Sequence, residues 1–393
     1  MTERANRLGA RMSEFDQVSP RYGADSLMDV LPSALATLGV PGFTDILGLR
    51  LDGVRRIAVL LIDGLGWHQI PTAAPFAPTL ADLAARAPRM ITTGFPSTTP
   101  TSLVSLGTGV SPGTHGVLGF RVAIPGTDTV LTHTHWRHDP DPAVWQPVPT
   151  LFERAAATGL TVTVANRPEF THSGLTMAAN RGADYRPASD DELAAGVLAG
   201  LGPAGAPPAL SYGYFPDLDR YGHVFGVDSE PWRAAAVEVD HLLDRVLDGL
   251  PADAALLVTA DHGQLDVPAE HRFDFDADPR LQAGVRVVAG EPRVRYLHTR
   301  PGATEDVLAT WTEILGDAAW VANREEVIAQ GWFGPVPERN LERIGEVVAI
   351  CHGTHAIVAP TSEHAIKAML IAYHGAYSAV EMEIPLLVSR ARS

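Results

Sequence analysis

Thiol chemistry has almost no basis in this sequence. Cys351 is the single cysteine, which excludes an intrachain disulfide and a zinc site built from several thiolates. Lysine is equally scarce, with Lys367 as the one example beside abundant arginine and alanine, and this scarcity carries no functional inference. A metal site in the chain would therefore depend on ligands other than several thiolates.

Long apolar runs and clusters of basic charge are also missing. No run of about 18 apolar residues occurs, so no transmembrane helix is predicted. The segment from Met1 to Tyr22 lacks the apolar part of a secretory signal, and a cytoplasmic protein is the default expectation. The formal net charge is −16 without basic clusters, which argues against a nucleic acid polymer or an anionic membrane as a partner. Nothing in the sequence indicates an oligomeric state.

Strand patterns alternate with helix patterns along a chain of 393 residues, long enough for one large domain with an insertion. The strand-like segments are 54–62, 90–93, 160–165, 209–215, 254–260, 346–350 and 384–389. The helix-like segments are 78–86, 99–109, 150–158, 190–201 and 230–250. This alternation predicts an α/β fold, a three-layer αβα sandwich with a largely parallel central sheet.

The domain organisation expected from these patterns has two parts. Residues 1–50 form an N-terminal arm with one amphipathic piece at 26–38. Residues 51–393 form the large domain, and a small cap is inserted around 270–345. Within the cap we expect a helix near 304–315 and strands around 284–298.

Acidic and imidazole side chains recur beside glycines or directly after predicted strands. They lie in four short segments: Asp63-Gly64, Asp219 with His223, Asp261-His262-Gly263, and His374-Gly375. A buried strand that ends on a carboxylate and a glycine turn places the acid at the carboxyl edge of a sheet. Asp219 and His223 are four residues apart, so they can share one face of a helical turn. Carboxylate and imidazole without thiolate are typical ligands of hydrolytic zinc, manganese or iron, and two such ions can clamp a phosphoryl displacement.

Each segment taken alone has an ordinary structural interpretation. An aspartate after a strand is commonly a helix cap or a turn residue. An Asp-His-Gly turn can be a hydrogen-bonded loop pair, and Asp-x-x-x-His spacing is common by chance. The four segments together, most of them at strand ends, favour a joint metal site.

A cluster of hydroxyls precedes the helix predicted at 99–109. The cluster reads Gly94-Phe95-Pro96-Ser97-Thr98-Thr99-Pro100-Thr101-Ser102. An alcohol at a helix start lies over the positive end of the helix dipole, which favours an alkoxide or a bound phosphate. For Thr101 and Ser102 we expect only helix capping.

These segments together resemble the alkaline phosphatase superfamily, and within it the nucleotide pyrophosphatase/phosphodiesterase branch. The matching stretches, in the family's order over about 310 residues, are Leu61-Ile62-Asp63-Gly64, Phe95-Pro96-Ser97-Thr98-Thr99, Thr108-Gly109 through His115-Gly116, Asp219-Arg220-Tyr221-Gly222-His223, Asp261-His262-Gly263 and His374-Gly375. The resemblance implies two divalent metal ions, zinc in this family. One ion would be held by Asp219, His223 and His374. The other would be held by Asp63, Asp261 and His262, with a threonine nucleophile in contact with the metal centre.

The resemblance implies that Thr99 is this nucleophile and metal ligand. Counting from Phe95 and from Thr108 both lead to Thr99, and Thr98 is the alternative. Pro100 departs from the family pattern after the threonine. Proline suits the first helical position, so Thr99 is expected as the N-cap of the helix.

The implied function is a metal-dependent phosphodiesterase or nucleotide pyrophosphatase that forms a covalent phosphothreonine intermediate. Its substrate would be a small phosphate ester such as a nucleotide. One departure concerns the substrate: the family has an asparagine where this chain has Val117-Leu118-Gly119-Phe120. A phosphomonoesterase or phosphonate hydrolase is therefore the alternative, and a non-catalytic phosphate- or metal-binding relative is the alternative of another class. No substrate-binding residue is identified.

Several other motifs are less informative. His115 is expected to fix a loop, and His133, His135 and Trp136 are expected either in a pocket or in a surface loop. His352 and His355 imitate a ligand pair, but the family position falls on His374. The run Gly64-Leu65-Gly66 lacks the third glycine of a dinucleotide fingerprint, and no His-Glu-x-x-His peptidase motif occurs.

Overall fold

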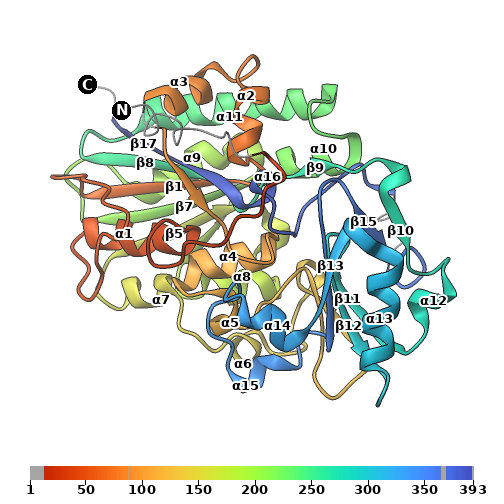
Figure 1. Cartoon of the computed structure of the whole chain (residues 1–393). Coiled ribbons are helices and arrows are strands. Elements are labelled where there is room, and N and C mark those ends of the chain that lie inside the picture. The colour runs from red at the N-terminus through yellow and green to blue at the C-terminus, as the bar shows by residue number, and fades with distance from the viewer. Residues whose placement is uncertain (1–12, 87, 364–368, 392–393) are drawn as a thin grey trace, which may run out of the picture.

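A seven-stranded sheet forms the centre of the larger part of the molecule (Figure 1). The computed structural model describes residues 13–86, 88–363 and 369–391, so Met1 and Lys367 lie outside the described residues. In spatial order the strands are β2 (Met90–Thr92), β17 (Glu383–Arg390), β8 (Ala254–Thr259), β1 (Arg56–Ile62), β7 (Ala209–Phe215), β5 (Thr161–Asn166) and β6 (Asp184–Pro187). The strands from β8 to β6 are parallel to their neighbours, whereas β17 is antiparallel to both β8 and β2.

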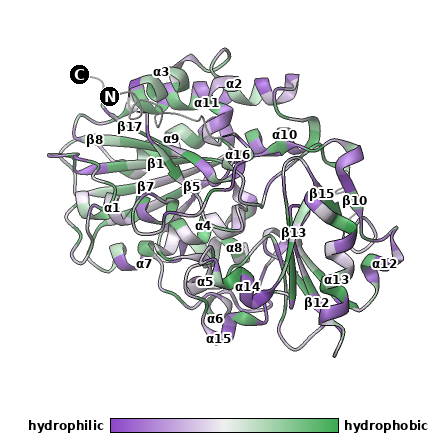
Figure 2. Cartoon of the chain, viewed as in Figure 1, coloured by the Kyte–Doolittle hydropathy of each residue, from purple (hydrophilic) through white to green (hydrophobic). Residues whose placement is uncertain are grey.

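The central strands are buried on both faces. Every residue of β1, β7 and β8 is buried, as expected for parallel strands between two helical layers. Figure 2 shows these strands as predominantly hydrophobic. The continuous apolar run of β1 is therefore the pattern of a strand at the middle of the sheet.

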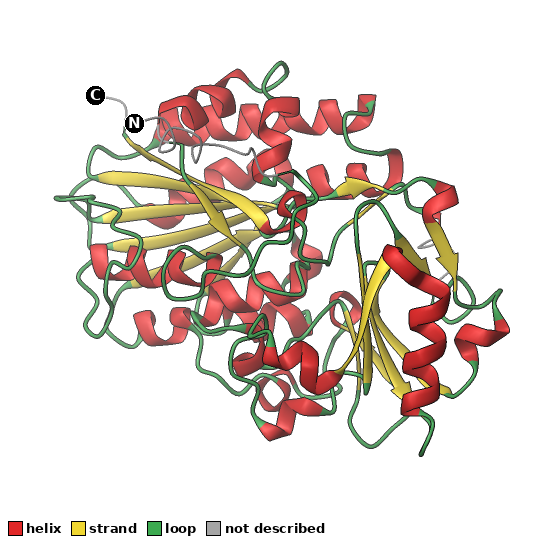
Figure 3. Ribbon diagram, viewed as in Figure 1, coloured by secondary structure: helices red, strands yellow, loops and turns green. Residues whose placement is uncertain are grey.

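Helices cover both faces of this sheet (Figure 3). One layer contains α2 (Ile70–Ala73), α3 (Pro78–Arg86), α9 (Asp190–Leu201), α10 (Asp217–Phe225) and α11 (Glu230–Gly249). The other contains α1 (Val30–Thr37), α4 (Thr99–Thr108), α7 (Leu151–Ala156) and α8 (Gly174–Asn180). The predicted three-layer αβα sandwich with a largely parallel sheet is confirmed.

A smaller antiparallel sheet lies beside the sandwich (Figure 1). Its strands, in spatial order, are β11 (Val285–Glu291), β12 (Val294–Thr299), β14 (Val347–Cys351) and β13 (Ala319–Asn323). Helix α13 (Thr304–Leu315) packs on this sheet and buries Trp311. We call these four strands and α13 the small sheet lobe.

Short elements complete the described chain. The remaining strands are β3 (Arg121–Ala123), β4 (Val130–Thr132), β9 (Leu265–Asp266), β10 (Arg272–Asp274), β15 (Ala356–Val358) and β16 (Ala372–Tyr373). The remaining helices are α5 (Pro112–His115), α6 (Pro142–Trp145), α12 (Pro279–Gln282), α14 (Arg324–Ala329), α15 (Glu338–Leu341) and α16 (Ala379–Met382). The 3₁₀ turns are Leu27–Asp29, Trp67–Gln69, His133–His135, Pro168–Phe170, Ala269–His271 and Gly316–Ala318. Among the described residues, none of the helices has both the length and the apolar composition needed to cross a membrane.

The segments predicted as arm and cap pack closely with the rest. Leu27 and Leu31, from the predicted arm, are fully part of the core under the main sheet. Strand β14, which sequence analysis placed after the cap, pairs with β12 and β13 instead. Local sequence shows that a segment is a strand but not which sheet it joins. The division into an arm, a large domain and a cap around 270–345 stays a prediction.

A buried ion pair connects the small sheet lobe to the sandwich. Arg293, in the turn between β11 and β12, donates from Nη2 to Oε2 of Glu381 at 2.7 Å and from Nε to Oε1 at 3.1 Å. Both side chains are fully buried. Glu381 lies in α16, directly before β17 of the main sheet, and also accepts the backbone N–H of Ala376 at 2.9 Å. The pair is therefore bidentate and its carboxylate is well satisfied.

Replacing Arg293 by alanine is expected to lower the free energy of unfolding by about 3–5 kcal/mol, because Glu381 would remain buried without its counterion. Urea unfolding followed by circular dichroism measures this change. The matched control is Arg86→Ala, which breaks the exposed pair with Asp82, for which we expect a change within about 0.5 kcal/mol. Equal, small changes for the two variants would contradict the prediction.

Candidate metal centre

The predicted ligand segments meet at one edge of the main sheet. Asp63 follows β1, Asp219 lies in α10 directly after β7, and Asp261 follows β8. Strands β7, β1 and β8 are parallel neighbours, so their carboxyl ends lie side by side. The topology brings together residues that are almost 200 positions apart in the sequence, since Gly64 N donates to Asp261 Oδ1 with a separation of 197 residues.

The first group of potential ligands contains Asp63, Asp261 and His262, with one ligand atom from each within 4.8 Å of the others. His262 Nε2 lies 3.4 Å from Asp63 Oδ1 and 3.2 Å from Asp261 Oδ2. These two carboxylate oxygens are buried, and neither accepts a hydrogen bond from the described residues. Buried oxygens without donors fit the binding of a cation.

The second group contains Asp219, His223 and His374 within the same 4.8 Å limit. Asp219 and His223 lie four residues apart on α10, and His223 Nε2 is 3.3 Å from Asp219 Oδ2. His374 Nε2 lies 3.1 Å from His223 Nε2 and 3.8 Å from Asp219 Oδ1. The prediction that Asp219 and His223 share a helix face is confirmed.

Backbone carbonyls fix the orientation of all three histidines. Nδ1 of His223 lies 2.7 Å from the carbonyl oxygen of Ala372, and Nδ1 of His374 lies 2.8 Å from that of Ser97. Nδ1 of His262 lies 3.2 Å from the carbonyl oxygen of Gly263. A carbonyl only accepts, so each Nδ1 carries the hydrogen and each Nε2 directs a lone pair into the site. This is the usual orientation of metal-bound imidazoles.

Burial and charge shift the protonation of the site. Burial, together with the negative charges of Asp261 and Asp219, raises the pKa of Asp63 well above its ordinary value. Burial opposes ionisation of Asp219, but His223, His374 and His262 together outweigh it and lower the pKa of Asp219. Burial and the neighbouring His262 lower the pKa of His374 to about 3. A neutral His374 beside crowded carboxylates is the protonation state that divalent metal binding requires.

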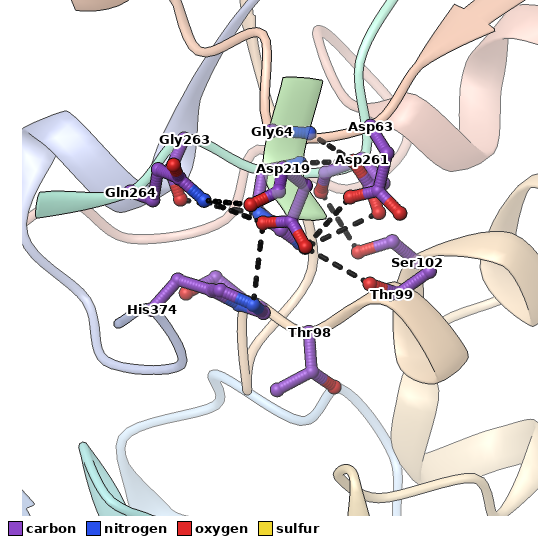
Figure 4. Close-up of polar contacts among 12 residues, drawn as sticks. Asp63, Gly64, Thr98, Thr99, Ser102, Asp219, Asp261, Gly263, Gln264 and His374 are labelled. Carbon is purple, nitrogen blue, oxygen red and sulfur yellow. Dashed lines mark hydrogen bonds and ion pairs between the residues drawn. The ribbon is translucent and has the colours of Figure 1, made fainter. Parts of the chain in front are cut away.

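Thr99 points toward the ligand groups, whereas Thr98 does not (Figure 4). Thr99 Oγ1 lies 3.1 Å from His262 Nε2. Thr98 Oγ1 instead donates to Thr101 Oγ1 at 3.0 Å. The expectation that Thr99 is the N-cap is wrong, because Thr98 has the extended N-cap conformation and α4 begins at Thr99, with proline in its first turn.

A glycine permits the close approach of two strand ends. Gly64 has a φ of +73°, and a Cβ there would lie 2.9 Å from both Cα and Cβ of Asp219. A larger residue would therefore push Asp219 away from Asp63 and strain the turn. The Asp-Gly sequence after β1 is explained by this contact.

Sequence analysis missed two residues that hold the carboxylates. The hydroxyl of Tyr214 donates to Asp63 Oδ2, and Gln264 Nε2 donates to Asp219 Oδ1 at 2.6 Å. Tyr214 is the penultimate residue of β7, and Gln264 directly follows Gly263. Their position at strand ends was the available signal, but neither residue type is a metal ligand by itself.

The other candidate histidines lie outside the two groups in the described part of the chain. His115 bonds Ser105 Oγ at 2.9 Å and accepts from Val117 N at 3.1 Å, which confirms its loop-fixing role. His133 is fully buried with Trp136, so the surface-loop alternative is wrong for these two, whereas His135 is exposed. His352 bonds the Tyr377 hydroxyl at 2.6 Å, and His355 stacks on His271.

The fold and the two adjoining ligand groups define a member of the alkaline phosphatase superfamily. The pattern of the type I phosphodiesterase / nucleotide pyrophosphatase family matches residues 57–375, and the chain belongs to this family. Its members include hydrolases that act on phosphoric ester bonds. A comparison with curated proteins returned no match.

Solved structures of two kinds share the fold. Mouse ectonucleotide pyrophosphatase/phosphodiesterase 5, in an inactive threonine-to-alanine form with AMP, has a TM-score of 0.67 and 17% identity over 84% of this chain and 87% of that chain. The human protein of the same name has a TM-score of 0.62 and 18% identity over the same shares of the two chains. Phosphonoacetate hydrolase from Sinorhizobium meliloti, in complex with phosphonoacetate, has a TM-score of 0.64 and 18% identity over 86% of this chain and 91% of that chain.

The two groups of three predict two metal ions per chain, and loss of one group should remove one ion. We expect His374→Ala, after chelation and reloading, to bind about one ion fewer than the unchanged protein. The substitution leaves only Asp219 and His223 in the second group, and two side-chain ligands are too few to hold an ion. Inductively coupled plasma mass spectrometry measures the metal content.

The control for the metal measurement is His271→Ala, which changes a histidine outside both groups. This variant should bind as much metal as the unchanged protein. Full metal content in His374→Ala would show that the second group is not a metal site.

Proposed function

We propose that the protein is a metal-dependent phosphodiesterase that works through a covalent phosphothreonine intermediate on Thr99, with zinc as the metal. The observation that carries the proposal is the position of Thr99 Oγ1, 3.1 Å from His262 Nε2. The two ligand groups adjoin there, since the rings of His262 and His374 stack with centroids 3.5 Å apart. A hydroxyl beside two buried ligand groups is the arrangement that phosphoryl transfer to an alcohol requires.

Two sets of three side chains would hold the two metal ions of this reaction. Asp63, Asp261 and His262 would hold one ion, and Asp219, His223 and His374 the other. Two bound divalent ions would supply positive charge that lowers the pKa of a hydroxyl and offsets the charge of a phosphate.

Thr99 Oγ1 attacks phosphorus, the bond to the departing ester oxygen breaks, and that oxygen leaves as an alcohol after taking a proton. Water then cleaves the bond between phosphorus and Thr99 Oγ1, which releases a phosphate monoester and restores the hydroxyl. The first turn of α4 lies beneath Thr99, and its N–H groups favour the negative charge that develops there. Tyr214 and Gln264 keep the carboxylates in place through their hydrogen bonds.

Similar proteins support the reaction class. The mouse relative is inactive with a threonine replaced by alanine and binds AMP, which supports a threonine in the mechanism and a nucleotide as one candidate substrate. The Sinorhizobium enzyme binds phosphonoacetate, which makes phosphonate hydrolysis the second candidate function. A phosphomonoesterase remains the third, and a non-catalytic relative is disfavoured by the complete set of ligand side chains.

The Thr99→Ala variant is expected to keep its metal and to lose at least about a thousandfold in kcat, because it lacks the attacking oxygen. The assay is release of an aryl alcohol from an aryl phosphate diester. Thr98→Ala is the matched control, since among the described residues Thr98 Oγ1 bonds only Thr101, and it should retain activity within about tenfold. Full turnover by Thr99→Ala would remove Thr99 from the mechanism.

Substrate preference separates the candidate functions. The metal-replete protein should hydrolyse an aryl phosphate diester faster than the corresponding monoester, because the cavity beside Thr99 offers space for a second ester group. Both rates and the metal content are measured on one preparation. A monoester preference would favour the phosphatase alternative, and turnover of phosphonoacetate alone would favour the phosphonate hydrolase.

A further inference from the structure

A cavity of about 80 Å³ lies beside Thr99 between the sheet and the helices of one layer. Thr99 and Leu103 of α4 line one side, and Asn166 and Tyr212 at the sheet line another. Phe170 also lines it, and its ring packs edge-on against Tyr214 with centroids 6.3 Å apart. Every described residue that lines the cavity is uncharged.

Two largely buried side chains line this cavity and carry a polar atom that has no partner among the described residues. Tyr212 is 2% exposed and Asn166 is 7% exposed. Asn166 Oδ1 accepts the backbone N–H of Arg167 at 2.8 Å, but its Nδ2 forms no hydrogen bond with the described residues. The Tyr212 hydroxyl also has no partner among them. Neither polar atom is fully shielded from solvent, so both can bond a polar atom of a ligand that enters the cavity.

The cavity is too small for an aromatic ring. A protein cavity of about 150 Å³ admits benzene, and this cavity has about half that volume. A nucleobase is larger than benzene and would not be enclosed by this cavity. A short alkyl group with one hydroxyl fits both the volume and the unpartnered donors.

The surroundings also disfavour a negatively charged group in the cavity. Arg167 is the cation adjacent to Asn166 in sequence, but its guanidinium is already paired. Its Nε lies 2.8 Å from Asp190 Oδ1, and its Nη2 lies 2.7 Å from Asp217 Oδ2. A carboxylate in the cavity, such as that of phosphonoacetate, would therefore lose its hydration without gaining this counterion.

We propose that this cavity binds the ester group that stays on phosphorus and selects a small, uncharged, hydroxylated alkyl group. Its hydroxyl bonds the Tyr212 hydroxyl and the Asn166 amide. The proposal rests on the phosphodiesterase activity proposed above and specifies its substrate class. The intermediate on Thr99 is then a hydroxyalkyl phosphothreonine, and water releases a hydroxyalkyl phosphate.

The test compares three diesters that share one aryl leaving group and differ in the retained group: ethyl, 2-hydroxyethyl and a 5′-nucleoside. We expect kcat/KM to be about tenfold higher for 2-hydroxyethyl than for ethyl, and lowest for the nucleoside, because one hydrogen bond of this kind corresponds to about tenfold. A nucleoside ester hydrolysed as well as the hydroxyethyl ester would overturn the proposal. If no diester is hydrolysed by the metal-replete protein, the proposed phosphodiesterase function itself fails.

Substitutions of the lining residues test whether the cavity causes this preference among the retained ester groups. Tyr212→Phe removes only the hydroxyl and should lower the hydroxyethyl-to-ethyl ratio of kcat/KM by about tenfold. Phe170→Ala enlarges the cavity and should raise the nucleoside-to-ethyl ratio. The control is Tyr185→Phe, whose hydroxyl bonds the Arg167 carbonyl oxygen outside the cavity, and it should leave both ratios unchanged. An unchanged hydroxyethyl-to-ethyl ratio in a folded Tyr212→Phe protein would overturn the role of Tyr212.

Discussion

Three carboxylates, those of Asp63, Asp219 and Asp261, are buried at one sheet edge, and their mutual repulsion must be opposed by the structure around them. Repulsion from Asp261 and Asp219 contributes to the raised pKa of Asp63. The opposing interactions are hydrogen bonds from the Tyr214 hydroxyl to Asp63 and from the Gln264 amide to Asp219. These donors leave Asp63 Oδ1 and Asp261 Oδ2 without a hydrogen bond from the described residues, which fits the proposed binding of cations.

The same edge explains why the fold and the chemistry depend on each other. Parallel pairing of β7, β1 and β8 brings distant carboxylates together, and the backbone carbonyls of Ser97, Gly263 and Ala372 set the imidazole rings. Orientation by main-chain atoms does not depend on neighbouring side chains. The ligand geometry is therefore a property of the loops that leave the sheet, held by the packed strands behind them.

The sequence predicted the parts of this arrangement that local pattern encodes. Asp63 and Asp261 were found because apolar strands end directly before them, and the position of the helical pair was visible from its spacing. Tyr214 and Gln264 were missed because they act only through the carboxylates that they contact. The pairing of β14 with the small sheet could not be read from its sequence, since an apolar strand fits either sheet.

The Arg293–Glu381 pair connects the small sheet lobe to the candidate metal centre through a few hydrogen bonds. The carbonyl oxygen of Glu381 accepts the backbone N–H of Gly263 at 3.0 Å, directly after His262, and its side chain accepts the N–H of Ala376, two residues after His374. Glu381 therefore contacts both the small sheet lobe and the loops that carry His262 and His374. If ions bind there, thermodynamic linkage requires that ion binding and packing of the lobe stabilise each other by the same factor.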